Sequence, residues 1–96
     1  MVKTKKKPSE HDVRVKRIVG GYRSQGWKVE ADHIKGCKTP RTIYGKRPDI
    51  IARKGAKERI IEVENGDSLK KDLVQRNAFN RFASLKKKRK FRTSVI

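Results

Sequence analysis

Three carboxylates, Asp49, Glu62 and Glu64, stand on two neighbouring segments that have the composition of β-strands. β-Branched residues are frequent in both segments, which run over residues 47–52 and 59–64. Carboxylate oxygens are ligands that Mg²⁺ prefers, and one or two of them suffice together with waters and a substrate phosphate. These residue types therefore point to a divalent metal site that acts on a phosphate-bearing substrate.

A short turn between the two segments decides whether these side chains meet. A symmetric turn over residues 54–57 places Asp49 directly opposite Glu62. Opposed residues point to the same face of a sheet, with Cβ atoms about 5 Å apart. Because side chains alternate along a strand, Glu64 shares this face with Glu62. Like charges so placed repel unless a cation lies between them, so the hairpin predicts a shared metal site.

A plainer interpretation makes Glu62 and Glu64 ordinary solvent-facing residues that form salt bridges with Arg47 or Arg53. The apolar residues around these glutamates do not alternate cleanly, however, so this strand is expected to be central and mostly buried. Buried carboxylates need a cation or hydrogen bonds. The strand pattern therefore favours a functional cluster.

Elements on either side of the hairpin complete one small domain over residues 9–96. The sequence predicts a basic flexible tail over 1–8, followed by a helix from an N-cap at Ser9 to about Ser24 that stops at Gly26. A half-buried strand over 27–32 and a basic loop over 33–46 lead into the two strands of the hairpin. A second helix, capped by Asp67 or Ser68, then runs to about Lys86, and a strand over 91–96 follows. A helix between two strands indicates a parallel crossover, so we expect an α/β fold around a mixed sheet.

The second helix has apolar residues on two sides. The stripe expected to cover the sheet consists of Val74, Ala78, Phe82 and Leu85. Leu69 and Leu73 lie nearly opposite this stripe. We expect that side either to meet a partner subunit or to pack against the basic loop.

The charge of the chain indicates a polyanionic partner. Its 28 lysines and arginines stand against 10 acidic residues, which gives a net charge of +18, and such an excess is typical of nucleic-acid binders. No aromatic-rich basic amphipathic helix supports a membrane-surface role, and the apolar runs are too short to span a bilayer. With one cysteine there is no internal disulfide, and no apolar leader follows the first lysines. We expect a cytoplasmic, nucleoid-associated protein.

Several basic side chains are candidates for contact with the nucleic-acid backbone. They are Lys35, Lys38, Arg41, Lys46 and Arg47 in and beside the basic loop, Arg53 on the hairpin, and Lys70, Lys71 and Arg76 on the second helix. Each alone can also be an ordinary surface charge. No base-reading motif occurs, so recognition by shape and backbone is favoured. His11 and His33 lack metal-ligand spacing and are interpreted as generic exposed residues that could touch DNA.

The order of elements, with Pro48-Asp49 on one strand and Glu62-Val63-Glu64 on the next, resembles the PD-(D/E)XK nuclease superfamily. The chain looks most like the small archaeal Holliday junction resolvases and related archaeal nucleases, over about residues 9–96. The resemblance implies a restriction-endonuclease-like αβββαβ core with a mixed sheet flanked by helices. It also implies metal-dependent cutting of DNA, with branched or duplex DNA as the partner and a homodimer that cuts two strands symmetrically.

The resemblance also assigns roles to individual residues. Asp49 and Glu62 match the metal ligands of the motif, and Mg²⁺ or Mn²⁺ would be the cofactor, with the backbone carbonyl of Val63 as an extra ligand. Glu10 matches a glutamate on the first helix of the resolvases and would bind a second metal or hold a water. Gln75 falls where many members place a polar helix residue, and it is counted among the candidate DNA contacts.

One position departs from the pattern of the superfamily. The motif lysine, two residues past the acidic residue, is Glu64 in this chain. Some restriction enzymes of the superfamily carry glutamate there, so Glu64 is expected to act as a general base or as a ligand. Lys70 or Lys71 offers an alternative group for orienting the water.

Three functions follow from these patterns. The leading hypothesis is a metal-dependent DNA endonuclease. The second is a non-catalytic DNA-binding module of the same fold, in which Glu64 marks the loss of activity. The third is a small basic ribosomal or chromatin protein, which would need no carboxylate cluster.

Overall fold

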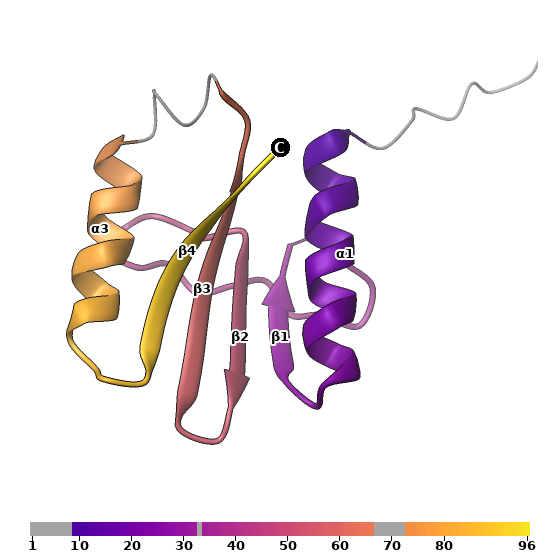
Figure 1. Cartoon of the computed structure of the whole chain (residues 1–96), viewed down its shortest axis with the longest axis horizontal. Helices are drawn as coiled ribbons and strands as arrows, with labels where there is room; N and C mark the ends of the chain where they lie inside the picture. The colour runs from indigo at the N-terminus through magenta and orange to yellow at the C-terminus, as the bar shows by residue number, and fades with distance from the viewer. Residues whose placement is uncertain (1–8, 33, 67–72) are drawn as a thin grey trace, which may run out of the picture.

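The computed structural model describes residues 9–32, 34–66 and 73–96 (Figure 1). In chain order its elements are α1 (Glu10–Ser24), β1 (Lys28–Ala31), β2 (Ile50–Lys54), β3 (Lys57–Glu64), α3 (Leu73–Ser84) and β4 (Arg89–Val95). Several expectations lie outside the described residues, namely the tail over 1–8, His33, the cap at Asp67 or Ser68, Leu69, Lys70 and Lys71.

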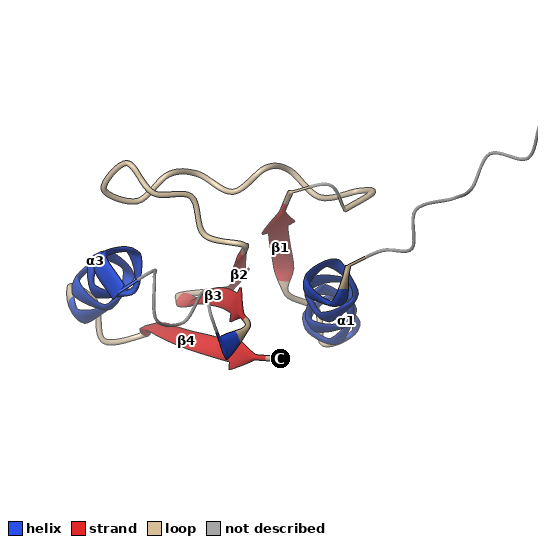
Figure 2. Cartoon of the chain, turned by 90° about the horizontal axis from the view of Figure 1, so that it is seen from above, coloured by secondary structure: helices blue, strands red, loops and turns tan. Residues whose placement is uncertain are grey.

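The four strands form one mixed sheet in the order β1-β2-β3-β4. The β1–β2 and β2–β3 pairs are antiparallel, and β3 and β4 are parallel with α3 between them in the chain. Viewed from above, α1 and α3 lie on opposite sides of this sheet (Figure 2). The α/β class and the mixed sheet are therefore confirmed. β2 begins at Ile50 rather than Arg47, so the first basic residue of the predicted strand belongs to the preceding loop.

The first helix begins where its capping residue predicts. The Ser9 hydroxyl accepts a hydrogen bond from the backbone N–H of Asp12 at 3.1 Å, which satisfies one of the free donors of the first turn. The helix ends at Ser24, and Gly26 follows with φ +85°, a conformation that glycine adopts without steric cost. Val15 and Val19 are its buried residues and direct one face towards the sheet.

Substitution of Ser9 by alanine is expected to reduce the free energy of unfolding by about 1 kcal/mol, because one N-terminal donor of α1 loses its partner. Urea unfolding followed by far-UV circular dichroism measures this change. Ser9→Asp should retain most of the stability, since aspartate caps a helix as well as serine does. If Ser9→Asp lost as much free energy of unfolding as Ser9→Ala, the loss would not come from the missing helix cap.

The hairpin has the register that a symmetric two-residue turn predicts. Lys54 pairs with Lys57, and the ladder continues to the pair formed by Ile50 and Ile61. Gly55 has φ +59° at the first central position of the turn, where a primed turn needs a positive φ. The next opposed pair beyond the ladder is Asp49 with Glu62.

The core is divided between the two faces of the sheet. On one face, Val15 and Val19 of α1 pack with Ala31, Ile50, Ile61 and Val63. On the other face, Phe79 of α3 packs with Ile43, Ile51 and Ile60. Because successive residues of β3 point to opposite faces, Ile61 and Val63 meet α1 whereas Glu58, Ile60, Glu62 and Glu64 share the face that α3 covers.

The predicted stripe on the second helix is wrong for Val74 and Leu85, whereas Phe82 packs against the core cluster as predicted and Ala78 is half-buried. Val74 and Leu85 are 73% and 64% exposed, whereas Phe79 is fully buried and Ala83 is 7% exposed. The helix also ends at Ser84, two residues before the predicted end. Burial of the larger Phe79 ring against Ile51 and Ile60 removes more apolar surface from water than burial of Val74 would.

The loop between β1 and β2 begins on the α1 side, where Ile34 and Cys37 pack against the cluster around Val15, and then passes to the α3 side of the sheet (Figure 2). Its Ile43 is buried in the cluster around Phe79, and the carbonyl of Lys38 accepts a hydrogen bond from Ala31 N at 2.9 Å. The loop therefore covers the outer edge of β1, which would otherwise offer free backbone groups.

Candidate active site

Asp49 and Glu62 are joined by reciprocal hydrogen bonds at the start of β2 and the end of β3. The backbone N–H of Asp49 donates to Glu62 Oε1 at 2.8 Å, and the backbone N–H of Val63 donates to Asp49 Oδ2 at 2.8 Å. Each carboxylate thus binds the backbone next to the other. The preceding Pro48 is buried and has no N–H to satisfy. This arrangement holds the two acidic side chains together as the register predicts.

Gln75 brings α3 to the same carboxylate. Its Nε2 donates to Glu62 Oε2 at 2.8 Å, so both oxygens of Glu62 accept a hydrogen bond. Glu62 is only 3% exposed. Its carboxylate is therefore fixed in orientation by one bond from the loop before β2 and one from the helix.

A pocket of about 520 Å³ collects the predicted acidic residues. Glu64 lines it from the end of β3 and is itself buried, whereas Glu10 lines it from the first turn of α1 and is exposed. The backbone of β4 adjoins it, because Ile96 N donates to the carbonyl of Glu64 at 2.8 Å. The pocket is lined by Ser9, Glu10, His11, Asp49, Glu62, Val63, Glu64, Asn65, Gln75 and Ile96.

His11 is a member of this site that the sequence interpretation missed. Its Nε2 lies 3.2 Å from Asp49 Oδ2, and its Nδ1 lies 3.5 Å from Asp12 Oδ1. The side chain stays 44% exposed, but the expectation of a generic residue is wrong, because the start of α1 docks against the loop before β2. Its position directly after Glu10, which was already assigned to the site, is the signal that could have found it.

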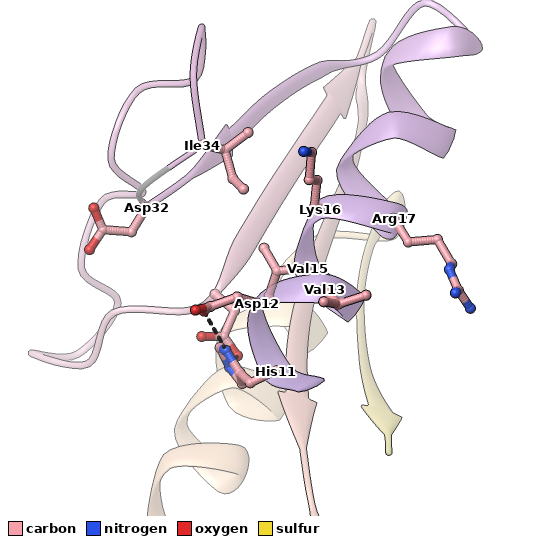
Figure 3. A pocket seen from close by; sticks show the side chains of 9 residues that line it. His11, Asp12, Val13, Val15, Lys16, Arg17, Asp32 and Ile34 are labelled. Atoms are coloured by element: carbon pink, nitrogen blue, oxygen red, sulfur yellow. Dashed lines mark ion pairs between the residues drawn. The ribbon is translucent and has the colours of Figure 1, made fainter. Parts of the chain in front are cut away.

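His11 and Asp49 also border a second, more apolar pocket of about 710 Å³ between α1 and the loop after β1. Figure 3 shows Val15, Ile34 and Lys16 around this space, with the pair of His11 and Asp12 at one side. The Asp49 carboxylate is thus reached from two sides, one acidic and one largely apolar.

The pKa of Glu62 is raised to about 8, mainly by burial and next by the negative charge of Asp49. The charge of Glu64 also raises this pKa, whereas the hydrogen bonds from Asp49 N and Gln75 lower it by less than the two charges raise it. An ionised Glu62 would face two other carboxylates with little water to screen them. The pocket consequently carries an excess of negative charge, which a proton or a cation must neutralise.

The donors of the pocket fit a hard divalent cation. Asp49 and Glu62 offer carboxylate oxygens in one pocket, and Mg²⁺ commonly takes one or two carboxylates with waters and phosphate oxygens completing its shell. In the described part of the chain, no three His, Cys, Asp or Glu side chains already converge as a metal-binding group. Glu10 and Glu64 line the pocket without completing such a triad.

The predicted DNA-contacting residues are spread over the molecule. Lys35, Lys38, Lys46 and Arg47 are exposed on the loop before β2, and Arg76 is half-buried beside Gln75. Arg41 and Arg53 lie instead at the hairpin end of the sheet, where both contact Glu58. Arg41 is thus far from the acidic pocket although it belongs to the loop that leads to Asp49, because its guanidinium packs over the Phe82 ring.

Comparison with known proteins found no matching family model, no matching curated protein and no matching solved structure. None of the helices in the described segments has the length and apolar composition needed to cross a membrane.

Proposed function

We propose that the protein is a metal-dependent endonuclease that hydrolyses phosphodiester bonds in DNA, with branched or junction DNA as the preferred substrate. The observation that carries the proposal is the reciprocal contact between Asp49 and Glu62 in a pocket shared with Glu10 and Glu64. In a chain with a net charge of +18, the gathering of four acidic residues in one pocket, two of them buried, needs a function. The order of helix, three strands, helix and strand supports a restriction-endonuclease-like core.

Asp49 and Glu62 are the proposed ligands of Mg²⁺ or Mn²⁺, with the backbone carbonyl of Val63 as an additional donor. When bound, the cation would activate a water and neutralise charge on the scissile phosphate. Gln75 orients the Glu62 carboxylate through its hydrogen bond, as outer partners of metal ligands commonly do. The N–H of Val63 orients Asp49 in the same way.

Glu64 takes the place of the motif lysine and is the proposed general base. It lines the same pocket and is 2% exposed, so a proton that it accepts would come from a group inside the pocket. Glu10 stands exposed on the first turn of α1, where it can hold a second cation or a water. His11 helps to orient Asp49, because its Nε2 lies near the same oxygen, Oδ2, that accepts the hydrogen bond from Val63 N.

A homodimer is part of this proposal, because a four-way junction presents two strands to be cut symmetrically. Leu73 is 55% exposed on the side of α3 that the sequence assigns to a partner subunit or to the basic loop. In the structure, the loop before β2 contacts α3 at Phe82 through Arg41 and Tyr44. The exposed start of α3 therefore stays available to a second copy.

Incubation of the purified chain with supercoiled plasmid, linear duplex and a four-way junction tests the proposed activity. We expect cleavage with Mg²⁺ or Mn²⁺, fastest on the junction, and none with EDTA, because the carboxylate pocket alone cannot neutralise a phosphate. Gel electrophoresis of end-labelled substrates measures the products. If DNA is bound but not cut with any divalent cation, the protein is a non-catalytic DNA-binding module rather than an enzyme. A preference for RNA would favour the ribosomal alternative.

A further inference from the structure

A strongly basic hollow lies at the end of β3 that is remote from the acidic pocket. It has a volume of about 660 Å³ and occupies the space between the β2–β3 turn and the connection from α3 to β4. Seven of the residues that line it are cationic and one is acidic. They are Arg41, Arg53, Gly55, Ala56, Lys57, Glu58, Lys86, Lys87, Lys88 and Arg89.

Glu58 contacts all three arginines that line this hollow. Its Oε2 accepts a hydrogen bond from Arg53 Nε at 2.7 Å, and its Oε1 accepts one from Arg89 Nε. The Nη2 of Arg41 lies 3.7 Å from the same carboxylate. Burial alone would raise the pKa of Glu58, but the hydrogen bonds and charges of Arg53 and Arg89 outweigh it and lower the pKa. Glu58 is therefore a fixed anion beneath three guanidinium groups.

The lysines of the hollow add positive charge that the carboxylates of Glu58 and Glu30 do not balance. Arg53 has a second carboxylate partner in Glu30, at 3.0 Å, but within the described residues the ion pairs of the structure include neither Lys57 nor any lysine of residues 86–88. Four ammonium groups thus surround a cluster that Glu58 and Glu30 already neutralise only in part. Such a concentration of positive charge is costly without a polyanion.

The connection that carries three of these lysines is tied to the sheet. The carbonyl of Lys88 accepts hydrogen bonds from Glu58 N at 3.0 Å and from Arg59 Nη1 at 3.1 Å. Arg89 is 8% exposed, with its guanidinium 3.7 Å from the centre of the Phe82 ring and its Nη1 donating to the Phe82 carbonyl at 3.1 Å. The lysines are consequently presented on an ordered turn, so binding an anion costs little backbone entropy.

From this geometry we propose that the hollow is a second phosphate-binding site, which holds the DNA backbone at a fixed distance from the acidic pocket. This inference takes its substrate from the proposed function but rests on different residues. Guanidinium and ammonium groups together suit phosphate oxygens. Glu58 and Glu62 share one face of β3 and are four residues apart, or about 13 Å along the strand. A DNA strand that reaches from one site to the other would therefore span only a few nucleotides.

The test removes the three lysines of residues 86–88 together, by substitution with alanine. Binding to a 30-base-pair duplex and to a four-way junction is measured by fluorescence anisotropy in EDTA at several salt concentrations. We expect affinity to fall at least about tenfold at 0.1 M salt, and the slope of log K against log salt to become shallower by about 2–3, since each lost phosphate contact removes about 0.9. The control variant removes Arg17, Lys28 and Arg92, three exposed cations outside the hollow.

Equal loss of affinity and slope in both triple variants would overturn the proposal, because the lysines would then act only through net charge. Titration with inorganic phosphate separates the two sources of phosphate: if it saturates the hollow of the unmodified protein while DNA affinity stays unchanged, the site is one for a free anion and the backbone assignment fails. Since all binding is measured without metal, the absence of cutting would leave this inference standing while removing the proposed activity.

Discussion

Replacement of Glu62 by glutamine should stabilise the metal-free protein at pH 8.5 and at the same time abolish its Mg²⁺ binding. Glutamine keeps the size of the side chain and can still accept the hydrogen bond from Asp49 N, while a flipped Gln75 amide can accept from its new N–H group. The substitution therefore removes charge with little change in packing. An ordinary surface glutamate would show neither effect.

The pH dependence gives the sign of the stability change. Folded Glu62 holds its proton up to about pH 8, whereas in the unfolded chain it titrates near 4.5. Between these values the folded state binds more protons, so its stability falls as the pH rises and then levels off above pH 8. At full ionisation the cost is on the order of 5 kcal/mol, since one pKa unit corresponds to about 1.4 kcal/mol. In EDTA at pH 8.5, the Glu62→Gln variant should therefore melt at least about 10 °C above the unmodified chain.

Glu58→Gln is the matched control, since it makes the same change on the same strand and the same face. The pKa of Glu58 is lowered in the fold, so its charge stabilises the protein above its unfolded pKa, and its neutralisation should lower the melting temperature. Mg²⁺ should raise the melting temperature of the unmodified protein and of Glu58→Gln at pH 8.5 but not that of Glu62→Gln. Metal stabilisation that persists in Glu62→Gln would remove Glu62 from the ligand set.

Asp49→Asn should reduce cleavage by at least about 100-fold and leave DNA binding intact or stronger. Loss of even an outer partner of a metal ligand costs up to about 100-fold, and Asp49 is proposed as a ligand itself. The asparagine oxygen can still accept a hydrogen bond from Val63 N, so the loop before β2 keeps its position. Loss of one negative charge beside a phosphate favours binding. Cleavage rates under single-turnover conditions and anisotropy in EDTA measure the two effects.

Asp32→Asn serves as the control for this change, because Asp32 is an exposed aspartate outside the acidic pocket. It should cut at the rate of the unmodified protein. If both variants lost activity alike, general electrostatics rather than a ligand would explain the loss. If Asp49→Asn cut at the normal rate, Asp49 would have no place in the chemistry.

The hairpin could be predicted from the sequence because its information is local. Two β-branched segments and a turn with glycine fix the register, and the register alone places Asp49 opposite Glu62. The Ser9 cap and the stop at Gly26 are local in the same sense. By contrast, the start of β2 was placed three residues early, because Pro48 lets the chain leave the ladder at Asp49, whose N–H bonds a side chain instead.

The buried face of α3 could not be chosen from periodicity, since two apolar stripes compete on that helix. Tertiary packing decided it: Phe79 fits against Ile51 and Ile60, and the same rotation brings Gln75, one turn earlier, to Glu62. Anchoring the helix on Gln75 would have selected the correct face. The contacts of Arg41 depend on how the long loop docks, which no local pattern encodes. The contacts of His11 depend on how α1 docks, and its position directly after Glu10 was the one available signal.

The face of the sheet under α3 separates opposite charges along one strand. Carboxylates gather at the end of β3, cations gather at its beginning, and the apolar cluster around Phe79 lies between them. This separation of charge gives the molecule a dipole moment along β3, which can orient it in the field of a duplex before the two molecules touch. In the field of a duplex, the molecule would arrive with its hairpin turned towards the nucleic acid. The encounter would thus be oriented at low ionic strength and random at high ionic strength.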